Sequence, residues 1–139
     1  MKANALRDAV DIYCNKYCIA PAFQICDLFD IENPTDWDKD WPFGDHSGCY
    51  AFYCKNGGLL YVGKADTLRS RVQQYFVTDE TRKCGIAKNW GWSAPPRFVQ
   101  TIRANEIYEA PSLEAYLIGR LHPTDNQHYR IFSDMTGGC

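Results

Sequence analysis

The sequence feature that most constrains the fold is a pair of short β-rich runs joined by a turn signal. The runs are Cys49–Cys54 and Leu59–Val62, and Lys-Asn-Gly-Gly separates them. An Asn-Gly pair between two such runs is the strongest short signal of a β-hairpin, because both residues tolerate the positive φ angles of a tight turn. The chain is therefore expected to contain an antiparallel strand pair near its middle.

The turn also predicts the register of the hairpin. A two-residue turn at Asn56-Gly57 predicts three facing pairs: Cys54 with Leu59, Phe52 with Tyr61, and Tyr50 with Gly63. In this register Tyr50 and Tyr61 lie diagonally on one face, roughly 7–8 Å apart. Two phenol groups are thus expected to meet on one side of the sheet.

The glycine-lysine pattern after the turn has the appearance of a phosphate-binding loop. Gly58 and Gly63 are followed by Lys64. A phosphate-binding loop needs loop residues between its glycines and a Ser or Thr after the lysine to hold magnesium. Here Leu-Leu-Tyr-Val separates the glycines and Ala65 follows the lysine, so we reject the nucleotide-loop interpretation.

Hydrophobic periodicity and turn residues predict the other elements. In chain order these are an amphipathic helix over residues 4–18, a short helix opened by Pro21 and carrying Phe23, Cys26 and Phe29, an acidic irregular loop over 30–47, a helix with the stripe Leu68, Val72, Tyr75 and Phe76, a loop or irregular helix over 77–96, a third strand over 98–102, and a helix over 109–121.

One acidic residue falls on the apolar face of the last predicted helix. Ala110, Leu113, Leu117 and Leu121 recur at helical spacing, and Glu114 lies within their stripe. A carboxylate that faces the core must be paired, protonated or bound to a metal, because burying it bare is costly. A structural pairing with an arginine and a metal-binding role are both open at this point.

Charge is distributed unevenly along the 139 residues. Residues 1–46 carry four Lys/Arg against nine Asp/Glu, net −5, whereas residues 47–103 carry nine against three, net +6. A basic middle segment suits a polyanionic partner, although ordinary solvated surface gives the same pattern. The chain begins without an apolar leader and has no apolar run of membrane-spanning length, which predicts a soluble cytoplasmic protein without membrane contact.

The seven cysteines are expected to be free thiols that are mostly buried. Cys14 and Cys18 are four residues apart on a predicted helix and could share a metal with Cys26 or a histidine, so a zinc or redox site is the alternative. Paired Cys-x-x-Cys motifs are missing, which disfavours it.

A set of short motifs in fixed order resembles the GIY-YIG nuclease domain, and most of all the version in the incision nuclease of bacterial nucleotide-excision repair. The motifs are Gly48-Cys49-Tyr50, Tyr61-Val62-Gly63-Lys64, Leu68-Arg-Ser-Arg71 with Tyr75, Leu113-Glu114-Ala115, and Pro123 with Asn126. The resemblance covers about residues 47–127. Two positions depart from the family pattern, since Cys49 replaces isoleucine and Asp125 replaces tyrosine.

The resemblance implies a role for each matched residue. Tyr50, Tyr61, Arg71, Lys64 and Asn126 are implied to be catalytic, and Glu114 to hold a single divalent ion, Mg²⁺ or Mn²⁺. The implied substrate-binding residues are Gly63, Tyr75 and Arg69. A tyrosine near its ordinary pKa of ~10 is a poor base at neutral pH and needs a nearby cation to lower its pKa, and Lys64 and the metal are both candidates. Which of the two phenols takes the proton of the water is open at this point.

The implied protein is a metal-dependent DNA endonuclease, and the alternative is a non-catalytic module that binds nucleic acid or protein on the same scaffold. The fold class is α/β (α+β), with a small antiparallel or mixed three-stranded sheet flanked by helices. We predict an acidic helical N-terminal extension over residues 1–46 and the nuclease-like domain over 47–139. Residues 1–46 are a candidate surface for a protein partner or for a second copy in a homodimer.

Overall fold

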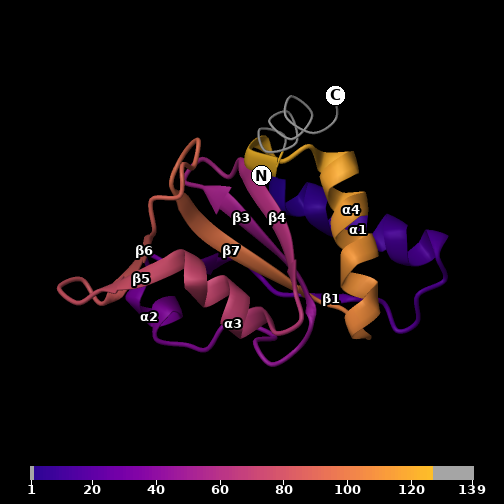
Figure 1. The fold of residues 1–139 in the computed structure, drawn as a ribbon, viewed down its shortest axis with the longest axis horizontal. Coiled ribbons are helices and arrows are strands. Elements are labelled where there is room, and N and C mark those ends of the chain that lie inside the picture. Colours follow the sequence, from indigo (N-terminus) through magenta and orange to yellow (C-terminus); the bar gives the residue numbers. More distant parts are fainter. Residues whose placement is uncertain (1, 127–139) are drawn as a thin grey trace.

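An antiparallel sheet forms the centre of the molecule (Figure 1). The structure is a computed structural model and describes residues 2–126. The sheet has the order β1-β7-β3-β4, and β2 also pairs with β7. Its strands are β1 (Gln24–Ile25), β2 (Phe29–Asp30), β3 (Gly48–Cys54), β4 (Leu59–Ala65) and β7 (Pro96–Arg103). The α/β fold class is confirmed, and the sheet has five strands where the sequence predicted three.

The β3–β4 hairpin has the register that brings the two phenols to one face. Phe52 lies opposite Tyr61 and Tyr50 lies opposite Gly63, as predicted. The turn itself is one residue longer than predicted. Its three residues 55–57 end on a glycine with a φ of 84°, which matches a hairpin loop closed by a glycine bulge. The register therefore shifts after Phe52, and the predicted pairing of Cys54 with Leu59 is wrong, because Tyr53 takes that place.

The central strand β3 is buried on both faces because different helices cover them. Its odd-numbered residues, Cys49, Ala51 and Tyr53, belong to a core with α1 (Lys2–Lys16) and α4 (Ala110–Leu121). Its even-numbered residues Tyr50 and Phe52 belong to a second core on the opposite face. Alternation of side chains along a strand thus divides the interior into two layers.

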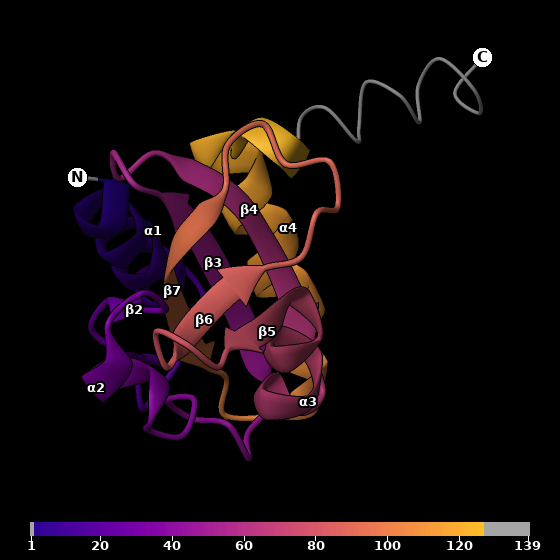
Figure 2. The same cartoon turned by 90° about the vertical axis from the view of Figure 1, so that its left-hand side faces the viewer.

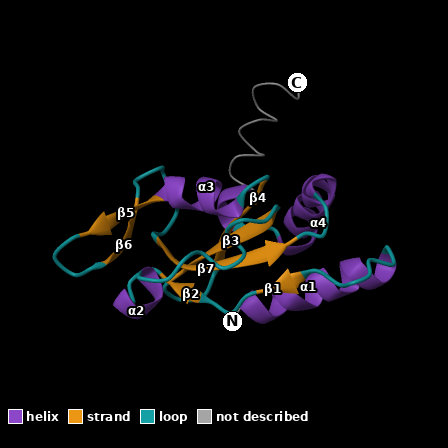
Figure 3. Ribbon diagram, turned by 90° about the horizontal axis from the view of Figure 1, so that it is seen from below, coloured by secondary structure: helices purple, strands orange, loops and turns teal. Residues whose placement is uncertain are grey.

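The second core lies under a short helix and a small hairpin. Helix α3 (Leu68–Val72) runs into a 3₁₀ turn, η1 (Gln73–Tyr75), and then into the hairpin of β5 (Phe76–Asp79) and β6 (Cys84–Ala87). Figure 2 shows these elements in front of the sheet, with α1 and α4 behind it. Figure 3 shows α3 and α1 on opposite sides of the strands. The β5–β6 hairpin occupies the first part of the range 77–96, where the sequence predicted a loop or irregular helix, so that prediction is wrong over residues 77–87, whereas residues 88–95 form a loop as predicted.

The hairpin escaped prediction because tertiary contacts stabilise it more than its own pattern does. Along β5 and β6, exposed and buried residues do not alternate regularly, so the strands lack the usual period-two signal. The backbone N–H of Gly85 donates to the carbonyl of Ile31 at 2.6 Å. A Cβ at Gly85 would overlap the ring of Trp37, so the glycine lets the indole pack on the strand.

The predicted short helix after Pro21 is wrong, because this segment pairs with β7. Gln24 lies opposite Arg103, and Phe29 lies opposite Val99. Residues 24–30 therefore belong to the same sheet as the hairpin. The long first helix is confirmed, and the last one is confirmed over residues 110–121 after a 3₁₀ turn η2 (Ile107–Glu109). The domain boundary between residues 46 and 47 stays a prediction.

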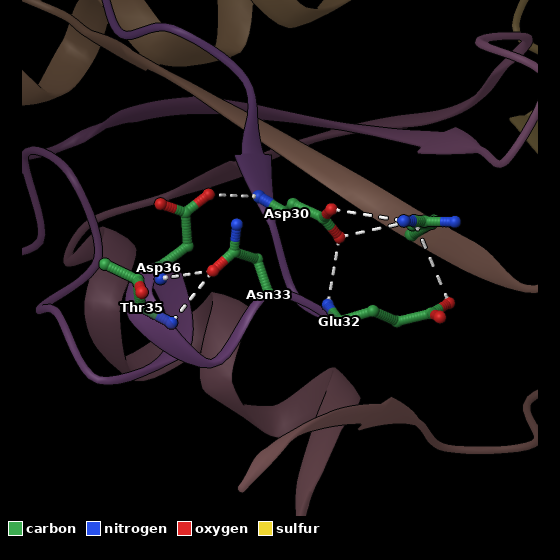
Figure 4. A network of polar contacts seen from close by, with 6 residues as sticks. Asp30, Glu32, Asn33, Thr35 and Asp36 are labelled. Atoms are coloured by element: carbon green, nitrogen blue, oxygen red, sulfur yellow. Dashed lines mark hydrogen bonds and ion pairs between the residues drawn. The ribbon is translucent and has the colours of Figure 1, made fainter. Parts of the chain in front are cut away.

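Polar contacts attach the acidic N-terminal segment to the sheet (Figure 4). The Arg97 guanidinium on β7 donates two 3.3 Å hydrogen bonds to the Asp30 carboxylate. Asp36 accepts a 3.0 Å hydrogen bond from the backbone N–H of Asp30. Asn33 caps the short helix α2 (Pro34–Trp37) by accepting from the N–H of Thr35 at 2.9 Å. The carboxylates of Asp30 and Asp36 in this acidic segment thus accept hydrogen bonds from groups within the fold.

Within residues 2–126 the helices are too short or too polar to cross a lipid bilayer.

Candidate active site

Three tyrosines from three elements meet on the face of the sheet that α3 covers. Tyr50 comes from β3, Tyr61 from β4 and Tyr75 from η1. The Tyr50 and Tyr75 hydroxyls are hydrogen-bonded at 2.8 Å. The Tyr61 ring centroid lies 6.2 Å from that of Tyr50 and 6.3 Å from that of Tyr75. Tyr50 is only 1% exposed, whereas Tyr61 is half-buried, so the second phenol is the more accessible one.

Gly63 makes room for this cluster. It lies opposite Tyr50 in the hairpin. A Cβ at this position would overlap three atoms of the Tyr50 ring and hydroxyl. The sequence assigned Gly63 to substrate contact, and the packing gives it a second function as the space that the Tyr50 ring occupies.

Burial dominates the acid–base properties of the phenols. It raises the pKa of Tyr50 and of Tyr61 well above the ordinary value, because the charged phenolate would be poorly solvated. Neighbouring tyrosines raise both pKa values further, and Arg71 opposes the rise. Arg71, and not Lys64, is thus the cation that opposes the rise in the pKa of Tyr61 in this structure, and an effect of a bound metal on that pKa stays a prediction. Both phenols are protonated at neutral pH.

A cleft of about 340 Å³ is lined by Arg71, which also acts on the charge of Tyr50 and Tyr61, although none of the three tyrosines lines the cleft itself. It is formed by the end of β4, by α3 and by the first turn of α4, and its lining includes Lys64, Asp66, Ser70, Arg71, Gln74 and Pro111. Lys64 and Arg71 are both exposed. Within residues 2–126, neither cation forms an ion pair with a carboxylate. The cleft thus combines two cations with the exposed Asp66 carboxylate, and Lys64 also interacts with the Glu114 carboxyl.

Glu114 lies on α4, one turn after Ala110, which lines the cleft. The carboxyl is half-buried, and burial raises its pKa above the ordinary value, while the Lys64 ammonium and backbone N–H oppose that rise. Glu114 also contributes to the raised pKa of Tyr61. This carboxylate is therefore electrostatically coupled to both a cleft lysine and a site tyrosine.

Two other predicted site residues have partners inside the protein. Asn126 accepts from the backbone N–H of Val62 at 2.7 Å and donates to its carbonyl at 3.1 Å. Its side chain thus holds the outer edge of β4 between Tyr61 and Gly63. Arg69 forms an ion pair with Asp45 of the N-terminal segment. Both contacts leave the predicted roles of these residues as predictions.

Asp125 takes part in another contact at this edge. It accepts a 3.3 Å hydrogen bond from the backbone N–H of Ser93, and its second carboxylate oxygen is buried without a hydrogen-bond partner among the described residues. The acidic residue that departs from the family pattern therefore attaches the segment between β6 and β7 to the end of α4.

Sequence reasoning missed a tryptophan that completes the cluster. The Trp92 ring lies 5.9 Å from both Tyr61 and Tyr75 and 5.7 Å from Phe52. Its indole N–H donates to the carbonyl of Lys88 at 3.1 Å. In the sequence, Trp92 lies in a segment with Gly91, Pro95 and Pro96. This segment has no hydrophobic periodicity that would predict packing of Trp92 against the sheet.

The cysteine alternative receives no support from the described residues. The six cysteines that they include are free thiols, and Cys14, Cys49 and Cys84 are buried. Residues 2–126 contain no group of three or more His, Cys, Asp and Glu side chains arranged to hold a metal. Cys139 lies outside the described residues. A metal at Glu114 would thus depend on one protein carboxylate plus water or substrate oxygens.

Comparison with known families agrees with this geometry. The family model for the UvrC-like GIY-YIG domain matches residues 46–127. The chain belongs to this family. The match includes every predicted site residue, from Tyr50 to Asn126, and it identifies a nuclease-type domain. The resemblance read from the motifs is confirmed.

Curated relatives match the same part of the chain. UvrABC system protein C of Borrelia duttonii (strain Ly) is 40% identical over 84 residues, which are 60% of this chain and 13% of the relative. The protein of the same name from Dictyoglomus thermophilum is 33% identical over 88 residues, 63% of this chain and 14% of the relative. The chain thus spans about an eighth of the length of these relatives.

Proposed function

We propose that this protein is a DNA endonuclease that hydrolyses phosphodiester bonds with a single divalent ion, Mg²⁺ or Mn²⁺. The observation that carries the proposal is the cleft lined by Lys64 and Arg71, because Lys64 interacts with the Glu114 carboxyl and Arg71 acts on the charge of Tyr50 and Tyr61. Polyanionic DNA suits the +6 charge of residues 47–103, nine Lys/Arg against three Asp/Glu. The name of the curated relatives favours a role in repair over restriction, defence or mobile-element cleavage.

The two cations fit the charge that develops on a phosphate during hydrolysis. Negative charge grows on the nonbridging oxygens, and positive groups that are already in place stabilise it without reorganisation. We assign Arg71 to bidentate contact with these oxygens, because its guanidinium presents a planar fork of donors. Lys64 supplies a second charge from the end of β4.

The chemistry of the Glu114 carboxyl fits a hard divalent cation. Mg²⁺ and Mn²⁺ prefer oxygen ligands, and Mg²⁺ keeps several waters when it binds to one or two carboxylates. Burial destabilises the ionised form of Glu114, and a bound cation would compensate for this. When bound, the ion would polarise the phosphate and stabilise the leaving oxygen.

The tyrosines act in this proposal as hydrogen-bond donors in the resting enzyme, because both pKa values are raised. We assign Tyr61 to the attacking water or a phosphate oxygen, since it is half-buried and is the most exposed of the three. Tyr50 is a positioning residue, because it is almost fully buried and holds Tyr75 through its hydroxyl. Asn126 positions Tyr61 through the backbone of Val62.

Cleavage assays on matched variants test the proposal. Purified protein is incubated with supercoiled plasmid and with labelled duplex, single-stranded and branched DNA, in magnesium, manganese or chelator. We expect metal-dependent cutting that falls by about two or more orders of magnitude in Glu114→Gln and in Arg71→Ala, the size seen when one stabilising group is removed. Glu80→Gln and Arg82→Ala on the β5–β6 hairpin are the controls and should cut like the wild type.

The outcomes separate the proposal from its alternative. Wild-type rates in both site variants, with folding confirmed by urea unfolding, would refute the assigned chemistry. Salt-dependent DNA binding without cutting in any metal would instead indicate the non-catalytic module.

A further inference from the structure

Trp90 is an exposed aromatic residue next to the tyrosine cluster. It lies in the segment between β6 and β7, and 53% of its surface is exposed. Its ring centroid is 4.6 Å from that of Tyr75, whose hydroxyl bonds to Tyr50. Figure 2 shows this segment crossing in front of β4, the strand that carries Tyr61 and Lys64. The exposed Trp90 ring therefore extends the aromatic surface of the tyrosine cluster toward solvent.

A lysine side chain lies close to the exposed ring of Trp90. The Lys88 ammonium lies 5.9 Å from the Trp90 ring centroid. Single exposed apolar side chains are common on protein surfaces and need no functional explanation. An exposed aromatic face combined with a neighbouring cation is the combination with which proteins bind single-stranded nucleic acid, because bases stack on the ring and phosphates contact the cation.

The segment is fixed at both sides of Trp90. The backbone N–H of Lys88 donates to the carbonyl of Tyr75 at 2.8 Å. Trp92 packs among Phe52, Tyr61 and Tyr75, and Ser93 is bonded to Asp125. The two neighbouring tryptophans thus differ: Trp92 anchors the segment in the core, and the anchored segment holds Trp90 at the surface.

We propose that Trp90 and Lys88 form a stacking platform for an unpaired base adjacent to the cleaved phosphate. A base inside an intact duplex is covered on both faces by its neighbours, so only a nucleotide in a single strand, bulge, flap or opened duplex presents a free face to the indole. The platform makes the enzyme selective for DNA with an unpaired nucleotide. This inference rests on the proposed function, because it places the base beside the phosphate that the cleft would hold.

Equilibrium binding without divalent metal tests the platform separately from cleavage. Fluorescence anisotropy compares a fully paired duplex, the same duplex with a one-nucleotide bulge, and a single strand. We expect Trp90→Ala to weaken binding of the bulged and single-stranded DNA by about 5- to 100-fold, the range for loss of one stacked base. Binding of the intact duplex should change by less than about twofold, and Trp90→Phe should keep most of the affinity.

The chain offers a matched control on its other side. The Lys16 ammonium lies 5.5 Å from the ring of Tyr17, which is 52% exposed at the end of α1. Tyr17→Ala removes an exposed aromatic residue with a neighbouring lysine from the acidic segment, and it should leave the affinity for all three DNAs unchanged. Urea unfolding of each variant shows that the fold is retained.

The failure of the platform and the failure of the nuclease proposal give different results. Equal weakening of duplex and unpaired DNA in Trp90→Ala, or no weakening of either, overturns the platform even if the enzyme cuts. Absence of DNA binding by the wild-type protein also overturns it. Selective loss of unpaired-DNA binding, in a protein that cuts nothing, supports the platform and refutes the endonuclease.

Discussion

Gly63→Ala is the substitution whose effect follows most directly from the packing of the site. The added Cβ would overlap the Tyr50 ring and hydroxyl. The ring has no room to move, because it is 1% exposed and is packed against Phe52 at 5.2 Å and Tyr75 at 5.7 Å between centroids. The strands must therefore separate locally or the tyrosine must leave its rotamer.

The expected cost is near the upper end of the range for overpacked cores. Overpacking costs about 1–3 kcal/mol, and we take about 3 because a buried ring provides the obstacle. Replacing a strand glycine by alanine also raises the free energy of unfolding by about 0.5–1 kcal/mol, because the unfolded chain has less conformational entropy to lose on folding. The net expectation is a loss of about 2 kcal/mol in the free energy of unfolding.

Urea unfolding at constant pH measures this loss, and α4 supplies the control. A Cβ added at Gly119 would meet no atom within 4 Å, so Gly119→Ala should raise the free energy of unfolding by up to about 1 kcal/mol. Gly63→Ala in a Tyr50→Ala background should cost far less than in the wild type, because the obstacle is gone. Equal stability of the two glycine variants, or no coupling to Tyr50, would refute the reasoning.

Three further predictions use other parts of the site. Asn126→Ala should lower the free energy of unfolding by about 1–2 kcal/mol, because two hydrogen bonds to Val62 are lost, whereas Asn105→Ala, which loses one exposed bond, should cost less than about 1 kcal/mol in the same urea assay. The pKa of Glu114 is raised in the folded state above the ordinary glutamate value of 4.5. Between these two pKa values the folded protein therefore binds more protons at this residue than the unfolded chain does. The free energy of unfolding falls as pH rises through the folded pKa. Glu114→Gln should therefore become increasingly stabilising without metal as pH rises from the ordinary glutamate value through the raised folded pKa, and a pH-independent difference in urea midpoints would contradict this. Asp45→Asn should change stability by less than about 1 kcal/mol and, by freeing Arg69, should steepen the log–log salt dependence of DNA binding by up to about one, while an unchanged slope would show that Arg69 does not reach phosphate.

Local sequence signals determined the hairpin and its flanking helices. The Asn-Gly signal indicated the hairpin, and the side-chain period of two placed Tyr50 and Tyr61 on one face, although the turn is one residue longer and the shift between Phe52 and Tyr53 restores the predicted register at Tyr50. Helical spacing placed Glu114 on the inner side of α4, where the structure has it half-buried. The order of the motifs was sufficient to indicate the family, since it needs residue types and spacing alone.

Contacts between distant segments decided what the sequence could not show. Residues 24–30 became strands because β7 offers an edge to pair with, although their local pattern favoured a helix. The pKa values of the tyrosines rose because α3, Trp92 and the neighbouring rings exclude water, an effect that depends on the burial of the whole cluster. Trp90 and Asn126 reach the site through folding that brings residues 62, 75, 90 and 126 together. The sequence by itself thus determined the family and the candidate site residues, and the tertiary structure decided the protonation of the tyrosines, the partners of these residues and the surface beside them.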